Sequence, residues 1–168
     1  MEFLRRITDM QIFGTGGIAA IKPRDTVRVV LLDDSNRVAV LYIGAEDFYM
    51  LPGGGIDAGE SPEQALAREV LEETGCRCKV TQELGVVEEN SAAHEYREIS
   101  YCYLAKVVGK NGEPSLTPEE QEEDTRLEWH PLPRAMELIK NQSVSLFDMK
   151  FCIQRDISIL MAVKNGAV

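Results

Sequence analysis

Apolar runs separated by turn-forming residues predict three β-strands in the first third of the chain. Residues 26–32 (TVRVVLL) form an almost continuous apolar run, as expected of a buried strand. The turn formers at 33–36 (DDSN) lead to residues 37–43 (RVAVLYI), which read as the hairpin partner. Residues 48–51 (FYML) predict a short strand that runs into the glycines at 53–55. Glycine lets a backbone approach a ligand closely, so these glycines form a candidate binding loop.

A helix with clear start and stop signals follows the glycines. Ser61 is a favourable N-cap, Pro62 takes the preferred first position, and Gln64 can complete a capping box. Gly75 is placed to end the helix as its C′ residue. The helical wheel puts the expected core face on the arc that holds Ala67, Val70, Leu71 and Thr74.

The second half of the chain predicts further strands and an acidic loop. Residues 79–88 and 98–107 read as strands, the second with two distinct faces in the alternation of SYCYLAKV. Residues 113–124 (EPSLTPEEQEED) are polar and acidic, so they are expected to form a surface loop. Residues 126–129 predict one more strand.

Two helices are expected near the C-terminus, at 133–140 and 146–163. The longer one is expected to cover the sheet, with a homodimer interface as the alternative. Strands interleaved with helices at these spacings predict an α/β fold in which helices cover a mixed β-sheet. We find no internal repeat or domain boundary, so residues 1–168 are expected to form a single domain. Residues 1–20 would be an N-terminal arm or an added strand.

The helix that begins after Ser61 concentrates acidic residues on one side. Glu69, Glu72 and Glu73 fall within an arc of roughly 100°. Each like-charge pair at this spacing costs a few tenths of a kcal/mol, and Arg68 relieves only part of the repulsion. A hard divalent cation such as Mg²⁺ takes oxygen ligands and would neutralise it. The alternative is a solvated acidic face, but the glycine run, the capped helix and the arginine at fixed spacing favour a metal site.

Composition and charge narrow the classes of partner. The chain has 168 residues, of which 44% are apolar, an ordinary share for one globular domain. Its net charge of −10 argues against nucleic acid as the main partner, because phosphate-backbone binding requires a basic surface. An acidic protein that acts on phosphates needs cations in between, and the metal site would supply them.

The four cysteines do not form a disulfide or zinc framework. Cys76 and Cys78 are separated by one residue, and only His94 and His130 are available as further zinc ligands. Reduced thiols in a cytoplasmic protein account for them better. The N-terminus lacks the apolar segment of a signal peptide, and no apolar run is long enough to cross a bilayer, so we expect no membrane association.

Residues 54–76 (GGIDAGESPEQALAREVLEETGC) resemble the Nudix box, the signature of the Nudix hydrolase family. The matching positions are Gly54, Glu60, Arg68, Glu69, Val70, Glu72, Glu73 and Gly75. Cys76 departs from the pattern, which usually has an aliphatic residue there, but a free cysteine is itself a small hydrophobe. The resemblance implies an α/β/α sandwich and a MutT-like hydrolase that uses Mg²⁺ or Mn²⁺ to cleave a nucleoside diphosphate linked to another group.

The resemblance also assigns roles to individual residues. The implied metal ligands are the carbonyl of Gly53 and the carboxylates of Glu69, Glu72 and Glu73. Glu60 would support these ligands, and Arg68 would hold the glutamates in place, so loss of either would be costly.

The identity of the general base is open. Some family members use the glutamate that corresponds to Glu69, and others use a glutamate on a later loop. In the acidic loop we favour Glu123, because its distance before Trp129 matches some relatives of the MutT type. A solvated charge run is the alternative for each loop acid; the others are Glu119, Glu120 and Glu122.

The substrate is expected to be a nucleotide-type small molecule, such as a nucleoside triphosphate or a nucleotide sugar. Candidate contacts are Gly54 and Gly55 in the glycine loop, and His94 and Tyr96 in an expected loop between strands. A single loop histidine or tyrosine can also be an ordinary surface residue. The alternative function is a catalytically silent nucleotide-sensing or regulatory module, which usually has lost a metal ligand; this chain retains the glutamates and the arginine.

Overall fold

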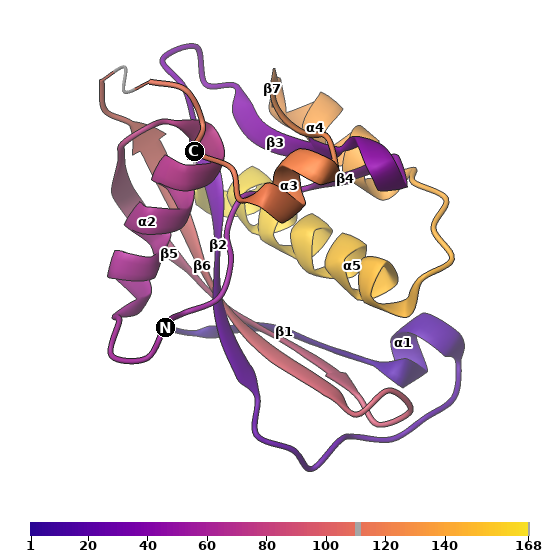
Figure 1. Cartoon of the computed structure of the whole chain (residues 1–168). Helices are drawn as coiled ribbons and strands as arrows, with labels where there is room; N and C mark the ends of the chain where they lie inside the picture. The colour runs from indigo at the N-terminus through magenta and orange to yellow at the C-terminus, as the bar shows by residue number, and fades with distance from the viewer. Residues whose placement is uncertain (110–111, 168) are drawn as a thin grey trace.

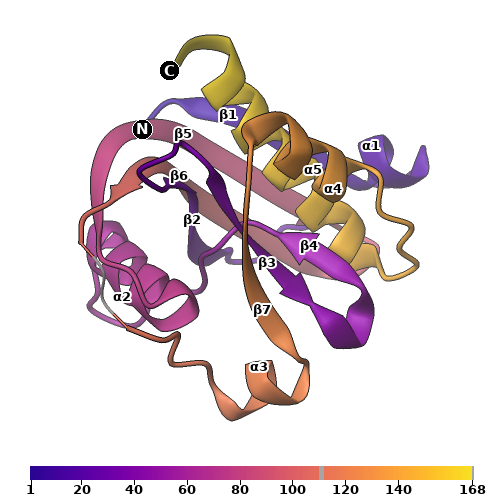
Figure 2. The same ribbon diagram turned by 90° about the horizontal axis from the view of Figure 1, so that it is seen from above.

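The computed structural model describes residues 1–109 and 112–167, which form one mixed sheet with helices on both faces (Figures 1 and 2). Within these residues the sheet has seven strands, of which six follow the order β1-β5-β6-β2-β3-β4 and the seventh, β7, pairs with β3. The β1–β5 and β2–β6 pairs are parallel, whereas the other pairs are antiparallel. The predicted α/β fold with a mixed sheet between helices is confirmed.

The strands and helices have the following bounds. The strands are β1 Phe3–Thr8, β2 Arg24–Leu32, β3 Val38–Ile43, β4 Phe48–Met50, β5 Cys78–Ser91, β6 Tyr96–Val107 and β7 Thr125–His130. The α-helices are α1 Asp9–Phe13, α2 Pro62–Thr74, α3 Pro118–Glu122, α4 Leu132–Lys140 and α5 Phe147–Ala162. Short turns of other helix types follow β3 at Gly44–Glu46 and α5 at Val163–Ala167.

Strand β2 is apolar at every position from Val29 to Leu32 because helices cover both of its faces there. Val27, Val29 and Leu31 pack in a cluster with Leu66 and Val70 of α2. This cluster fills the space between α2 and the sheet. Side chains alternate along a strand, so the remaining residues of β2 face the other way.

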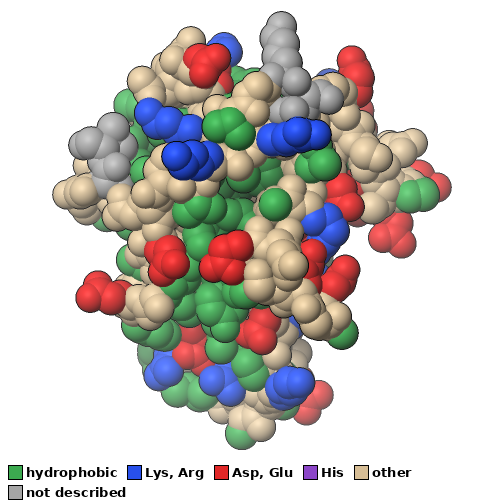
Figure 3. Space-filling view, turned by 90° about the vertical axis from the view of Figure 1, so that its left-hand side faces the viewer, with side chains coloured by type: hydrophobic (Ala, Val, Ile, Leu, Met, Phe, Trp, Pro, Cys, Tyr) green, Lys and Arg blue, Asp and Glu red, His purple; other side chains and the backbone are tan. Residues whose placement is uncertain are grey.

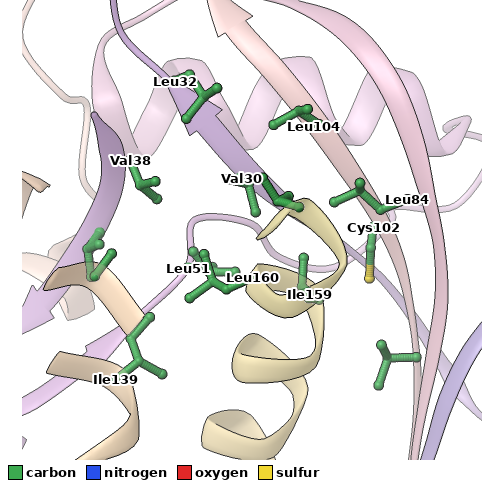
Figure 4. Close-up of a cluster of buried hydrophobic side chains, with 14 of the residues drawn as sticks. Val30, Leu32, Val38, Leu51, Leu84, Cys102, Leu104, Ile139, Ile159 and Leu160 are labelled. Carbon is green, nitrogen blue, oxygen red and sulfur yellow. The ribbon is translucent and has the colours of Figure 1, made fainter. Parts of the chain in front are cut away.

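The second cluster lies between the sheet and the pair α4 and α5 (Figure 4). Val30 and Leu32 of β2 meet Ile139 of α4 and Ile159 and Leu160 of α5 there. The apolar side of α5 is therefore used to cover the sheet, as predicted. Of the helices in the described part of the chain, none combines the length and the apolar character that crossing a bilayer requires.

Of the four residues predicted for the core face of α2, Val70 and Thr74 are buried, whereas the other two are not. Leu71 is 45% exposed and Ala67 is also exposed, whereas Leu66 is fully buried. The buried stripe runs through Leu66, Val70 and Glu73, because Glu73 turns inward to a backbone N–H of the glycine loop. The helix is thus rotated toward its acidic side relative to the wheel prediction.

Residues 113–124 are exposed as predicted, but they are not all irregular. Pro118–Glu122 form α3, which Thr117 caps by accepting a hydrogen bond from the backbone N–H of Glu120 at 3.3 Å. The capping signal in TPEEQ explains this short helix. The strand predicted at 98–107 begins earlier, so Tyr96 is the first residue of β6 and not part of a loop.

The N-terminal residues add a strand to the edge of the sheet. Phe3–Thr8 pair in parallel with β5, and α1 follows directly. Glu88 of β5 accepts hydrogen bonds from Arg6 of β1 at 2.7 Å and from Arg97 of β6 at 3.0 Å. The side chain of Glu88 therefore joins three neighbouring strands.

Because of Glu88, we expect the unfolding free energy to depend on pH in the acid range. Burial acts to raise the pKa of Glu88, but hydrogen bonds from Arg6 and Arg97 outweigh it and hold the pKa below its ordinary value. A carboxyl group whose pKa is lowered in the folded state stabilises the fold at pH values above its ordinary pKa. This stabilisation is lost as the pH falls. We expect Glu88→Gln to lower the unfolding free energy by about 1 kcal/mol at neutral pH. Urea titrations should show this difference shrink between about pH 5 and about pH 3; a constant difference would contradict the prediction.

Candidate active site

The glycine loop before α2 runs beside strand β2 and pairs with it through backbone hydrogen bonds. The backbone N–H of Val27 donates to the carbonyl of Gly54 at 2.9 Å, and that of Val29 donates to the carbonyl of Pro52 at 3.1 Å. Gly53 has a φ of 133°, and a Cβ there would lie 2.1 Å from the carbonyl oxygen of Val27. Only glycine fits at this position, so the sequence fixes the path of the loop across the sheet.

Helix α2 begins and ends where its capping signals predict. The Ser61 hydroxyl accepts from the backbone N–H of Gln64 at 3.3 Å, and Pro62 is the first helical residue. Gly75 closes the helix in the left-handed conformation with a φ of 65°. The acidic side of α2 is therefore held in a fixed position beside the glycine loop.

Arg68 ties the acidic side chains of the box together. Its Nη1 donates to Glu69 at 2.8 Å and to Glu72 at 3.3 Å. Its Nη2 donates to Glu60 at 2.9 Å and to the carbonyl of Gly55 at 2.9 Å. A planar guanidinium with five N–H donors can serve all four acceptors at once, which a lysine cannot. The structure thus brings five of the predicted site residues together.

Glu73 is the carboxylate that faces inward. Its side chain lies in the core, where Oε2 accepts from the backbone N–H of Gly53 at 2.7 Å. Burial raises the pKa of Glu73 to about 8, against the opposing charge of Arg28. Burial also raises the pKa of Glu69, although Arg68 opposes it. Both carboxyl groups hold their protons more tightly than usual, and a nearby cation would stabilise their ionised forms.

Gly54 leaves room for a carboxylate beside the loop. A Cβ at Gly54 would lie 2.3 Å from Oε1 of Glu69, so a side chain there would push this carboxylate away. On the side of the molecule that carries α2, acidic side chains cross the middle of the surface, with basic ones above and below them (Figure 3). An acidic zone of this kind attracts cations.

The donor atoms of the site suit a hard divalent cation. Glu69, Glu72, Glu73 and the carbonyl of Gly53 offer oxygen only, which Mg²⁺ and Mn²⁺ prefer. Across the part of the chain that the structure describes, no group of three or more His, Cys, Asp or Glu side chains is already arranged to hold a metal ion. Arg68 engages Glu69 and Glu72 instead. The donors therefore fit a metal chemically, and two of them also accept hydrogen bonds from Arg68.

Arg28 is a component of the site that the sequence analysis did not identify. Its side chain projects from β2, is only 9% exposed, and has Nη2 at 3.9 Å from Oε1 of Glu98. Its Nη1 donates to the carbonyl oxygen of Gly53. A signal was present in the sequence, because Arg28 is the charged residue inside the apolar run 26–32. A buried cation in such a run requires polar partners, and here it finds them at the glycine loop.

The acidic loop approaches the box through Glu120. The backbone N–H of Ser115 donates to the carbonyl of Glu72 at 2.7 Å, which docks the loop on α2. Burial is the main cause of the raised pKa of Glu73, and the negative charge of Glu120 adds to it. Glu123 instead lines a groove between β4 and the start of α5. Glu120 is therefore the loop acid whose charge acts on Glu73, while the preference for Glu123 as the base stays a prediction.

His94 and Tyr96 contact α5 and lie away from α2. The His94 ring stacks on Phe147 with centroids 3.9 Å apart, and Tyr96 meets Phe147 and Phe151 edge-on. Burial raises the pKa of Tyr96. Both residues belong to the β5–β6 turn region beside α1, at the far end of these strands from α2 (Figure 1). The structure does not join them to the glutamates of the box.

A buried charge network connects α5 to the glycine loop. Arg155 donates from Nε to Asp156 at 2.8 Å, and its Nη1 lies 3.4 Å from Glu89 and 3.6 Å from Glu98. Asp156 in turn accepts from the backbone N–H of Leu51 at 2.8 Å. These residues carried no local signal, because the partners come from distant strands and only the fold brings them together.

Comparison with known proteins places the chain among phosphate-cleaving relatives. It is 37% identical over 81 residues to a Bacillus subtilis protein named putative 8-oxo-dGTP diphosphatase, covering 48% of this chain and 52% of that protein. It is 43% identical over 67 residues to the RNA pyrophosphohydrolase of Saccharophagus degradans, covering 39% of each chain. The chain thus spans about half or less of the length of these curated relatives.

A solved structure and a family model agree on the fold and the family. The NUDIX hydrolase from Nitrosomonas europaea superimposes with a TM-score of 0.60 at 21% identity, covering 80% of this chain and 89% of that one. The model of the NUDIX domain matches residues 22–148, which include the glycine loop, α2 and the acidic loop. The chain therefore belongs to the NUDIX domain family.

Proposed function

We propose that this chain hydrolyses a diphosphate linkage in a nucleoside diphosphate derivative, with Mg²⁺ or Mn²⁺ as cofactor. The observation that carries the proposal is that α2 holds its glutamates beside the glycine loop, where Glu73 accepts from the N–H of Gly53 and Glu69 lies against Gly54. Family membership supports it, as do relatives named putative 8-oxo-dGTP diphosphatase and RNA pyrophosphohydrolase.

The residues divide the work of phosphoryl transfer, which depends mainly on positioning and electrostatic stabilisation. Glu69, Glu72, Glu73 and the Gly53 carbonyl would hold the metal, which neutralises phosphate charge and makes bound water more acidic. Arg68 orients the glutamates and is itself oriented by Glu60. The glycine loop lets a diphosphate lie close to the backbone, where a side chain would exclude it.

We assign the role of general base on the loop to Glu120, with Glu69 as the alternative on α2. Glu120→Gln should lower kcat by about a hundredfold or more and leave KM within a few fold, because a positioned base contributes mainly to the transition state. Glutamine keeps the side-chain oxygen that accepts from the backbone N–H of Thr117, so the cap of α3 survives. Steady-state kinetics of the proposed reaction measure both constants.

Glu123→Gln is the matched control on the same loop. Its kcat should stay within about threefold of wild type, because a loop acid that faces another groove does not touch the reacting atoms. A large loss of kcat in Glu123→Gln alone would return the role to Glu123. Normal kcat in both variants would leave Glu69 as the base.

The proposed function is tested by nucleotide and phosphate release with Mg²⁺ or Mn²⁺ over a panel of substrates. The panel contains standard and oxidised nucleoside triphosphates, nucleotide sugars, ADP-ribose and dinucleoside polyphosphates, with the Glu72→Gln protein as blank. Turnover of one class, absent from the blank, would support the hydrolase and identify its substrate. Nucleotide binding without turnover of any member would instead support the regulatory module.

A further inference from the structure

Arg28 is a buried cation with incomplete pairing. By strand alternation it faces the side of the sheet that α5 covers, where its register partner on β6 is Cys102. Its Nη1 donates to the carbonyl oxygen of Gly53, and its Nη2 is 3.9 Å from Glu98. Its Nε has no hydrogen-bond partner among the described residues. The guanidinium therefore sits between two acceptors without satisfying all of its own donors.

The peptide group of Gly53 is held from both ends. Its N–H donates to the carboxylate of Glu73, and its carbonyl accepts from Arg28. That carbonyl is one of the oxygen atoms that would hold a divalent ion. Arg28 thus places a positive charge at this oxygen.

Glu98 offers Arg28 a second place to bind. Its Oε1 accepts from the Thr26 hydroxyl at 3.2 Å and lies 3.6 Å from Nη1 of Arg155. The same oxygen is the one near Nη2 of Arg28. A guanidinium displaced from Gly53 would therefore move toward an anion that is already in contact range.

We propose that Arg28 competes with the divalent metal for the carbonyl oxygen of Gly53 and thereby sets the metal concentration at which the site fills. The inference rests on the proposed metal site but not on turnover. A guanidinium and a divalent ion repel each other when they share one oxygen, even with water-like screening. Direct binding of substrate phosphate by Arg28 is the weaker reading, because its side chain is only 9% exposed.

The test measures Mn²⁺ binding by calorimetry without any substrate. Arg28→Gln keeps a donor for the Gly53 carbonyl but removes the charge, so it should bind Mn²⁺ about tenfold more tightly than wild type. Arg28→Lys keeps the charge and should stay within about threefold of wild type. Equal or weaker binding by Arg28→Gln, or equally tight binding by Arg28→Lys, would overturn the proposal.

Arg24→Gln is the matched control for charge. Arg24 is also on β2 and lies 4.0 Å from Glu98, but its side chain is 70% exposed. Its removal should change Mn²⁺ affinity by less than about twofold, because solvent screens an exposed charge. A tenfold gain in this variant would show that any nearby charge sets the affinity, which would also overturn the proposal.

A second measurement uses the wild-type protein and does not depend on whether Arg28→Gln folds. The side-chain Nε–H signal of Arg28, assigned in isotope-labelled protein by its loss in Arg28→Lys, should shift as Mg²⁺ is added. The exposed Arg126 serves as the internal reference and should not shift. A static Arg28 signal while Mg²⁺ binds would refute the competition. If no ion binds to wild type or to any variant, the metal site itself fails, and this inference fails with it.

Discussion

Glu72→Gln is expected to lower kcat of the proposed hydrolysis by at least about a hundredfold, because the substitution removes a proposed metal ligand. Even changes to residues that only support metal ligands cost about 10–100-fold. The fold should not change. The Glu72 side chain is 46% exposed, and the contact it loses is the one to Arg68 at 3.3 Å. An exposed pair of this kind is worth about 1 kcal/mol or less, and the loss is offset by relief of repulsion from Glu69 and Glu73.

The measurement is kcat with a substrate found in the panel, together with a urea titration of each protein. Glu63→Gln is the matched control, because Glu63 is an exposed acid of the same helix outside the box pattern. It should retain kcat within about threefold, since its carboxylate would not touch the metal. Near-normal turnover in Glu72→Gln would contradict the assignment of Glu72. A loss of activity accompanied by an equal loss of stability would point to a structural role instead.

Local signals in the sequence were sufficient to predict the framework of the site. Ser61, Pro62 and Gly75 act within one or two turns of the chain, so they predicted the bounds of α2 correctly. Gly53 lies so close to β2, and Gly54 so close to Glu69 of α2, that a side chain would not fit at either position. A run of glycines in the sequence is itself a sign of such close contacts. The family pattern added the roles, because it records which residues act together without needing their coordinates.

Long-range features could not be predicted in the same way. The helical wheel placed Glu73 outside the expected core face of α2, whereas Glu73 is buried because it binds Gly53, twenty positions earlier in the chain. Arg28 has its partners on the glycine loop and on β6. The preference for Glu123 as the base rests on spacing along the chain, which does not place the loop in space, so it stays a prediction. Each of these features depends on contacts between segments that are distant in sequence.

The charge network on α5 explains how the far side of the sheet supports the glycine loop. Asp156 binds the backbone of Leu51, while Arg28 binds Gly53, so both ends of this short segment are attached to buried charges. Arg155 sits at the centre of the network and is the counter-charge shared by Glu89, Glu98 and Asp156. A change at Arg155 should therefore affect stability first, and the geometry of the loop as a consequence.

Arg155→Met is expected to lower the unfolding free energy by about 3–5 kcal/mol, which is the usual cost of leaving a buried charge without its partner. The Arg155 side chain is 1% exposed, so water cannot replace it as a partner for the carboxylates. Burial already raises the pKa of Glu89, and Arg155 opposes that rise, so the substitution should raise it further. A carboxyl group with a raised folded-state pKa destabilises the fold as the pH rises through that range. The variant should therefore regain stability as the pH falls from about 8 to about 5.

Urea titrations of wild type and Arg155→Met at several pH values test this prediction. Arg126→Met is the matched control, because Arg126 pairs with Asp124 on the surface and should be worth less than about 1 kcal/mol. Adding Glu89→Gln to Arg155→Met should restore more than about 1 kcal/mol, since it removes one of the carboxylates left without a counter-charge. The loss of unfolding free energy in Arg155→Met could instead persist at acid pH and in the double variant with Glu89→Gln. That result would mean that Arg155 contributes packing and not charge compensation.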